Sequence, residues 1–454
     1  MRPQYLIFLL IRLISFGWPI IALTAVIYAE GRRVDTVARA TGKLGSDLLK
    51  VIAKDEDNDN IVISPLSIQI PLHIVLQGAD PHGPTFEEIQ RYFEYRVAFK
   101  SSKDVHEPMQ ALIKSLGLES GKETIVSDNE QNTRRAKAPT KLSIANALVT
   151  RKDITLQTEF KDTVEQYYNI KMGSFDSSVP RSIPELAKRI NDWASNNTDG
   201  AIKGLINEGD LSADIVSILI NAVHLKGEWM YPFDGAGSRT FYKHGKKGQA
   251  IKTPFMHNTR YFKYLDLRQE TAESLPDAER QKNWLYYSLD CQIVSIPIDQ
   301  NGLSMMILLP GELDGLSKLY DIRITRIIDR MNQSGNNTKL NLRLPKFAFD
   351  VEYDVKDYLE QLGMRKLLSR KPELTKMFDK PDIAIDSIKH KAKINVTEQG
   401  VEASAVTAMS ISLLSMPVGP VVTPIQFVVD HPFMFAIVHK RHNVPLFMGQ
   451  VVTF

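Results

Sequence analysis

The strongest constraint on this chain is a long stretch without charge near its C-terminus. None of the 27 residues from Ala403 to Val429 is charged, although 24% of the 454 residues in the chain are charged. From position 401 the odd positions read Val, Ala, Ala, Thr, Met, Ile, Leu, and from position 402 the even positions read Glu, Ser, Val, Ala, Ser, Ser, Leu. Alternation of a mostly apolar face with a more polar face is typical of a half-buried strand.

The residues on either side of this stretch are compatible with both a strand and a loop. Gly400 directly precedes it and gives the backbone a permissive pivot. After Leu414 the sequence changes to SMPVGPVVTPIQ, in which three prolines favour an extended, exposed segment. Spacing alone favours an edge strand followed by a surface loop, and a loop that later becomes a strand is the alternative.

The N-terminus has the pattern of a targeting segment. Residues Tyr5–Ala29 are almost entirely apolar, Arg2 supplies a positive start, and Ala29 offers a small-residue cleavage point. We therefore predict a secretory signal peptide over residues 1–29. A signal anchor is the alternative because the stretch approaches the length that spans a bilayer, although Arg12 and Pro19 interrupt it.

Secretion is consistent with the glycosylation motifs and with the single cysteine. Four Asn-x-Ser/Thr sequons are candidate glycosylation sites, and they begin at Asn196, Asn332, Asn336 and Asn395. Asn332 and Asn336 fall in NQSGNNT, which we interpret as a loop, so they are the better acceptors. Cys291 is the only cysteine, which excludes an internal disulfide and any multi-cysteine metal site. Its surroundings, DCQIVSIPI, predict a strand and burial.

The overall charge excludes a general basic surface. Lys and Arg total 56 against 53 Asp and Glu, so we expect no nucleic-acid binding. One local basic cluster could bind a polyanion weakly, but Asp128 and Glu130 nearby dilute it, and a solvated loop is the favoured interpretation. The cluster comprises Arg134, Arg135, Lys137 and Lys141.

Helical and strand patterns alternate along the chain without a linker, which predicts an α+β protein. Val37, Ala40, Leu44, Leu48 and Ile52 recur at helical spacing. Further helices are expected over Phe160–Ile170, Ile183–Ala194 and Asp354–Leu362. Strands are expected where the sequence reads VSILINAVHLKGEW, QIVSIPI, LSMMILLP and KLNLRLPKFAF.

Four motifs, in order, resemble the serpin family of serine protease inhibitors from about Val37 to Phe454. NIVISPLSI (60–68) is similar to the start of the second helix, and INAVHLKGEWMYPF (220–233) to a strand and turn at the top of the central sheet. KHKAKINVTEQGVEASAVT (389–407) resembles the strand and hinge before the reactive loop. FVVDHPFMFAI (427–437) with PLFMGQVV (445–452) resembles the C-terminal signature.

The resemblance implies one serpin domain over residues 30–454, with three β-sheets, eight or nine helices and an exposed reactive-centre loop at about 398–424. Inhibitory members are suicide substrates: the protease forms an acyl-enzyme at the scissile bond, and the cleaved loop inserts into the central sheet and deforms the protease. The expected partner is a target serine protease held in a covalent acyl complex by a monomer. No cofactor and no metal are implied.

The resemblance also places the hinge and the reactive bond. The hinge residues are Glu398, Gly400, Val401, Ala403, Ala405 and Thr407. The inward residues are uncharged, namely Val401, Ala403, Ala405 and Thr407. Insertion requires this, because one buried charge would offset several kcal/mol of the free energy that insertion releases. Gln399 and Val401 depart from the commonest inhibitory pattern, which has an acidic residue and a Thr or Ser. We expect inhibition, with a non-inhibitory carrier or binding protein as the alternative.

Family spacing counted from Glu398 places the scissile bond at Leu414–Ser415, with Leu413–Leu414 and Met409 as alternatives. Leucine before the bond would fill a hydrophobic primary pocket, so chymotrypsin-, elastase- or cathepsin-like proteases are the expected targets. A trypsin-like target is disfavoured since no Lys or Arg lies between 403 and 429.

Structural residues complete the resemblance. The polar network beneath the sheet, called the shutter in this family, and the breach at the top of the sheet match Ser64, Ser67, Asn221, His390 and Trp229. For His390 and Trp229 an ordinary core position is the alternative interpretation. The sequence contains no G-x-S-x-G, H-E-x-x-H or P-loop pattern, so we expect no enzyme activity.

Overall fold

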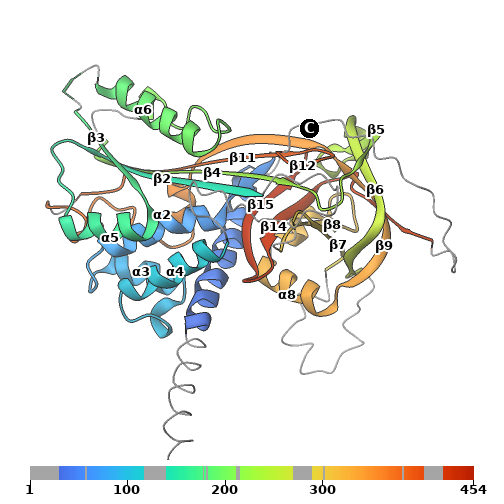
Figure 1. Ribbon diagram of the computed structural model, residues 1–454, viewed down its shortest axis with the longest axis horizontal. Helices are drawn as coiled ribbons and strands as arrows, with labels where there is room; N and C mark the ends of the chain where they lie inside the picture. Colours follow the sequence, from blue (N-terminus) through green and yellow to red (C-terminus); the bar gives the residue numbers. More distant parts are fainter. Residues whose placement is uncertain are drawn as a thin grey trace, which may run out of the picture.

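Helices of the N-terminal third gather on one side of a long sheet, and a second, strongly twisted sheet lies beside them (Figure 1). The computed structural model describes residues 30–56, 59–116, 140–176, 178–179, 182–210, 215–268, 289–299, 302–380, 383–402 and 423–454. In this part of the chain eight α-helices accompany two hydrogen-bonded sheets, so the predicted α+β class is confirmed.

The first helix, over residues 30–55, buries Val37, Ala40, Leu44, Leu48 and Ile52, so the helical spacing predicted it correctly. The helices expected near residues 160, 183 and 354 are also present, with ends shifted by a few residues. The other helices are α2 (Pro65–Gly78), α3 (Pro84–Tyr92), α4 (Lys103–Ser115), α5 (Thr158–Tyr168), α6 (Ser182–Asn197), α8 (Ile324–Ser334) and α9 (Lys356–Gln361). Short 3-10 helices are η1 (Tyr95–Val97), η2 (Glu208–Asp210), η3 (Lys243–Gly245), η4 (Lys247–Gln249) and η6 (Gly315–Leu319).

A six-stranded sheet runs across the molecule between two layers of helices. Its order is β10 (Phe347–Asp354), β11 (Ser387–Val396), β12 (Gly400–Val401), β4 (Ser217–Glu228), β2 (Lys141–Arg151) and β3 (Lys171–Phe175). One face packs on the main core, and the other packs Ile218 and Ile220 against Leu186 and Ile190 of α6. In Figure 1, α6 lies on one side of this sheet and α2 and α5 lie on the other.

The second sheet has nine strands. They are β1 (Ile61–Ile63), β15 (Val444–Val451), β14 (Phe433–His439), β8 (Leu303–Pro310), β7 (Cys291–Pro297), β6 (Ala250–Asp266), β9 (Asn336–Pro345) and β13 (Ile425–Val428), with β5 (Asp234–Tyr242) also paired to β6. The resemblance implied three sheets. The described residues form two because the 17-residue strand β6 pairs with β5, β7 and β9 and joins both halves into one ladder.

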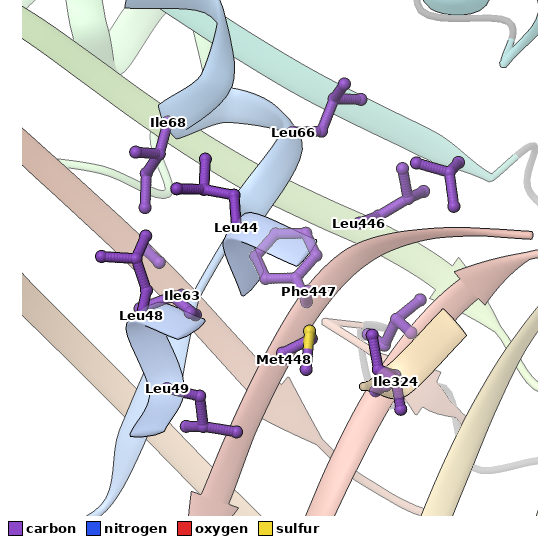
Figure 2. Packing of buried hydrophobic residues seen from close by; sticks show 14 of the residues in the cluster. Leu44, Leu48, Leu49, Ile63, Leu66, Ile68, Ile324, Leu446, Phe447 and Met448 are labelled. Carbon is purple, nitrogen blue, oxygen red and sulfur yellow. The ribbon is translucent and has the colours of Figure 1, made fainter. Parts of the chain in front are cut away.

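The first helix, α2 and β15 meet in the main core (Figure 2), where Leu44 lies near Phe447 and Leu48 lies near Ile63. Full burial of such side chains stabilises the fold by about 1.5–3 kcal/mol each. The first helix approaches so closely that a Cβ on Gly45 would lie 2.5 Å from Pro65 Cγ. A glycine is therefore required at this crossing.

Cys291 opens β7 and is fully buried, as its surroundings predicted. Burial raises the pKa of its thiol to about 12, so the thiol is protonated at neutral pH and a poor nucleophile. Within the described residues, no helix combines the length and apolar character needed to cross a membrane. The same part of the chain contains no cluster of three or more His, Cys, Asp or Glu able to hold a metal ion.

The sequons lie on regular elements. The prediction that NQSGNNT is a loop was wrong, because Asn332 lies in α8, Asn336 opens β9, and Gly335 alone separates the two elements. Both asparagines are exposed, as is Asn196 in α6. Asn395 lies inside β11 and is partly buried.

Candidate functional site

The hinge begins as a two-residue strand between the tops of β11 and β4. Val401 pairs antiparallel with Val396 of β11 and with Gly227 of β4. Below this point β11 and β4 pair directly and in parallel, from Ser387 with Ile218 up to Lys393 with His224. We call this direct pairing the seam. The sheet is therefore closed along the seam and forked above it, and β12 occupies the fork.

Gly400 has a different role from the one that the sequence indicated. Its φ is not in the left-handed region, so it is no pivot. A Cβ at this position would lie 2.1 Å from the carbonyl oxygen of Gly227 and 2.7 Å from Cα of Glu228. Glycine is required because the backbones of β12 and β4 approach so closely.

Glu402 directly follows β12, which ends at Val401. Its φ is 53°, in the left-handed region. The backbone N–H of Glu402 donates to the carbonyl of Asn395, and its carboxylate lies 3.0 Å from His224 Nε2 and 3.6 Å from Lys393 Nζ. Burial alone would raise the pKa of the Glu402 carboxyl, but His224 and Lys393 outweigh it and hold the pKa below its ordinary value.

Trp229 fixes the turn between β11 and β12, at the position where the resemblance placed the breach. Its indole Nε1–H donates to the carbonyl of Thr397 at 2.8 Å, and its backbone N–H donates to the carbonyl of Gln399 at 2.9 Å. The side chain is fully buried. Glu398 in the same turn pairs with Lys346 at 3.0 Å, which ties the turn to the segment between β9 and β10.

A buried polar network lies beneath the seam. Ser64 donates its backbone N–H to His390 Nε2 at 3.1 Å, so His390 Nδ1 carries the ring proton and donates to Asn221 Oδ1 at 2.8 Å. Complete burial lowers the pKa of His390 to about 3, which keeps the ring neutral. Asn221 in turn donates to Asn146 Oδ1 at 2.8 Å, which extends the network from β11 across β4 to β2.

Not every residue predicted for the shutter reaches His390. Ser67 donates its hydroxyl to the carbonyl of Ser64, at 3.0 Å. Sequence reasoning missed Asn146, which pairs directly with Asn221 across β2 and β4. The repeated Asn-Ala dipeptide in IANALVT and INAVHL was a signal that could have identified it.

Other predicted positions fall elsewhere. Ala403, Ala405, Thr407, Leu414 and Ser415 lie outside the described residues, as do Arg134, Arg135, Lys137 and residues 1–29. Lys141 of the basic cluster opens β2 and pairs with Asp199 at 2.8 Å. Its charge is thus already partnered.

Comparison with known proteins places this geometry in a family. Chicken (Gallus gallus) neuroserpin is 29% identical over 396 residues, which cover 87% of this chain and 86% of that protein. The structure of Serpin48 from the insect Tenebrio molitor superposes with a TM-score of 0.70 at 24% identity and covers 91% of this chain and 97% of the other. Human thyroxine-binding globulin, complexed with its ligand, gives a TM-score of 0.72 at 22% identity, covering 93% and 99%. The family model "Serpin (serine protease inhibitor)" matches residues 39–454, and the chain therefore belongs to the serpin family.

Proposed function

We propose that this serpin is a suicide-substrate inhibitor of a chymotrypsin-, elastase- or cathepsin-like serine protease. The protease would attack Leu414–Ser415 and become acylated by the loop. The freed hinge segment would then enter the six-stranded sheet between β11 and β4. This movement would carry the protease away and distort it before the acyl bond is hydrolysed.

The position of β12 is the observation that carries the proposal. The hinge already occupies the fork between β11 and β4, in antiparallel register with both strands. Further insertion would exchange the parallel seam for two antiparallel ladders. A dozen inserted residues gaining about 0.5–1.5 kcal/mol per backbone hydrogen bond would release on the order of 10 kcal/mol. That release would be the driving force of inhibition.

Val401 stands where the commonest inhibitory pattern has Thr or Ser, and its burial bears on whether the sheet accepts it. Its side chain is fully buried in the fork, so the sheet accommodates a β-branched residue at the first inward position. The following inward residues of the sequence, Ala403, Ala405 and Thr407, are small and uncharged. This pattern supports insertion and favours an inhibitor over a carrier.

We also propose that the protein is secreted. We infer that residues 1–29 direct export and that Asn196, Asn332 and Asn336 are the glycosylated sequons, because all three are exposed. Asn395 is a poor acceptor since it lies inside β11, in the middle of a sheet. Peptide mapping by mass spectrometry before and after treatment with an N-glycosidase would identify the occupied sequons.

A carrier or binding role is the second candidate. The structural similarity to thyroxine-binding globulin, a ligand-bound member of the same fold, motivates it. A carrier predicts that the loop is cleaved without formation of a covalent complex. We propose no catalytic activity of this chain in either case.

Incubation with proteases tests the proposal. The purified protein is mixed separately with chymotrypsin, elastase and trypsin, and the products are separated on denaturing gels. We expect an SDS-resistant complex with chymotrypsin or elastase and none with trypsin, because Leu414 would fit a hydrophobic pocket. Cleavage at Leu414–Ser415 without any complex would favour the carrier.

A further inference from the structure

The residue that ends the hinge strand also bridges the two strands of the seam. The carboxylate of Glu402 lies 3.0 Å from His224 Nε2 of β4 and 3.6 Å from Lys393 Nζ of β11. The three side chains are 14%, 4% and 32% exposed, respectively, so solvent screens these contacts less than it screens a surface ion pair.

The two partners of Glu402 occupy a special position in the sheet. Lys393 and His224 form the uppermost pair of the seam, directly below the fork that holds β12. If the register of β12 continues downward, residue 404 would lie opposite both of them. They are therefore the first pair that must separate before the hinge can enter further.

Strand insertion would change the backbone conformation of Glu402 together with the contacts of its carboxylate. A residue with a Cβ is strained at a φ of 53°, and this conformation cannot continue the strand β12. Strand insertion requires an extended backbone at the same residue. Opening the seam thus separates the partners of the carboxylate and removes the left-handed turn in a single step.

The geometry points to Glu402 as a latch residue, whose carboxylate joins β4 to β11 through His224 and Lys393 and so sets how readily the seam opens. Only one consequence of this inference rests on the proposed function, namely that the latch sets when the cleaved loop enters the sheet. The ion pair between Glu398 and Lys346 cannot replace the latch, because it ties the turn to the segment between β9 and β10 and does not cross the seam.

Hydrogen–deuterium exchange on the uncleaved full chain tests the latch directly. Residues 218–224 of β4 are the reporters, through those amides that face β11. We expect Glu402→Gln to accelerate their exchange roughly tenfold, because the neutral amide no longer attracts Lys393 and His224 through the charge of a partly buried carboxylate. His224→Gln should have a similar effect. The double variant should exchange little faster than either single variant, because both remove the same interaction.

Glu352→Gln is the matched control. Glu352 of β10 lies 3.9 Å from Lys389 Nζ and 3.7 Å from Lys391 Nζ of β11, so its contacts join two strands that stay together. Circular dichroism verifies that each variant is folded. Unchanged exchange in Glu402→Gln would overturn the latch, as would equal acceleration in Glu352→Gln.

The exchange measurement does not depend on protease inhibition. If the chain forms no SDS-resistant complex but Glu402→Gln still opens the seam faster, the latch stands and the proposed function fails. If the complex forms but the seam amides do not respond, the inhibitor proposal stands and the latch is rejected.

Discussion

The seam between β11 and β4 and the ladder between β14 and β15 are both buried strand pairs, but they are built differently. Every residue of β14 and β15 is buried, and the two strands pair antiparallel. In β11, buried residues alternate with partly exposed ones, and the pairing with β4 is parallel. Parallel pairing is slightly less stable per residue. The ladder of β14 and β15 is thus buried throughout, whereas the seam has partly exposed positions in β11 and contains the polar pair His390 and Asn221.

The largest expected effect comes from a charge at the fork. Val401 is already fully buried in the fork, so Val401→Arg would place a guanidinium there and would expel the hinge strand from which insertion continues. We expect at least a hundredfold loss of inhibition, with the variant cleaved as a substrate. Titration of residual chymotrypsin or elastase activity against inhibitor measures this loss, and Val401→Thr serves as the conservative control. Full inhibition by Val401→Arg would contradict insertion at the seam.

A cavity in the ladder between β14 and β15 should lower the stability of the whole fold. Phe435 of β14 is fully buried, so Phe435→Ala should lower the free energy of unfolding by about 3–5 kcal/mol. Because β14 does not move in the proposed insertion, intact and loop-cleaved protein should lose similar amounts. Denaturant unfolding of both forms measures the two values. A loss confined to one form would mean that β14 takes part in the rearrangement.

Acid should weaken the polar network beneath the seam. His390 is held neutral, with its pKa lowered to about 3, while an unfolded histidine titrates near 6.5. The unfolded state binds more protons below pH 6.5, so stability is full above that pH and is lost as the pH falls towards 3. The slope is at most about 1.4 kcal/mol per pH unit for each such histidine.

Thermal unfolding between pH 7.5 and 4.5 measures this slope. His106, whose pKa burial lowers to about 4, contributes to it in the same direction. His390→Gln should reduce the slope, although the variant is less stable at pH 7.5. An unchanged slope in that variant would show that His390 is not a source of the acid sensitivity.

The smallest loss of stability is expected where β11 pairs with β10, because this pairing stays closed in the proposed insertion. Lys391 Nζ of β11 lies 3.6 Å from Asp350 and 3.7 Å from Glu352 of β10, both of which are exposed. Lys391→Gln should therefore cost under about 1 kcal/mol. Urea unfolding is the measurement, and the change should be equal before and after loop cleavage. A larger change in one form alone would place β10 and β11 among the moving parts.

Local patterns predicted much of the fold. The helical spacing from Val37 to Ile52 and the apolar run around Cys291 were sufficient because each pattern depends on neighbours in the sequence. The resemblance assigned the hinge in the same way, through a contiguous motif.

Features that depend on strand pairing were not visible in the sequence. His224 and Lys393 are 169 positions apart and meet only because β4 and β11 pair in parallel. Likewise, Gly400 resembles a flexible pivot in the sequence, and its close approach to Gly227 appears only once β12 lies against β4. For Asn146 the repeated Asn-Ala dipeptide was visible in the sequence, but its meaning appears only once β2 pairs with β4.

The central claim is that the seam admits the cleaved loop as a strand, and thermal unfolding of intact and loop-cleaved protein tests it most directly. A protease that cuts within residues 403–422 without being trapped prepares the cleaved form. An insertion that releases on the order of 10 kcal/mol should raise the Tm by roughly 10–20 °C. Val401→Arg should lose most of this gain. An equal Tm for the intact and cleaved protein would contradict the account.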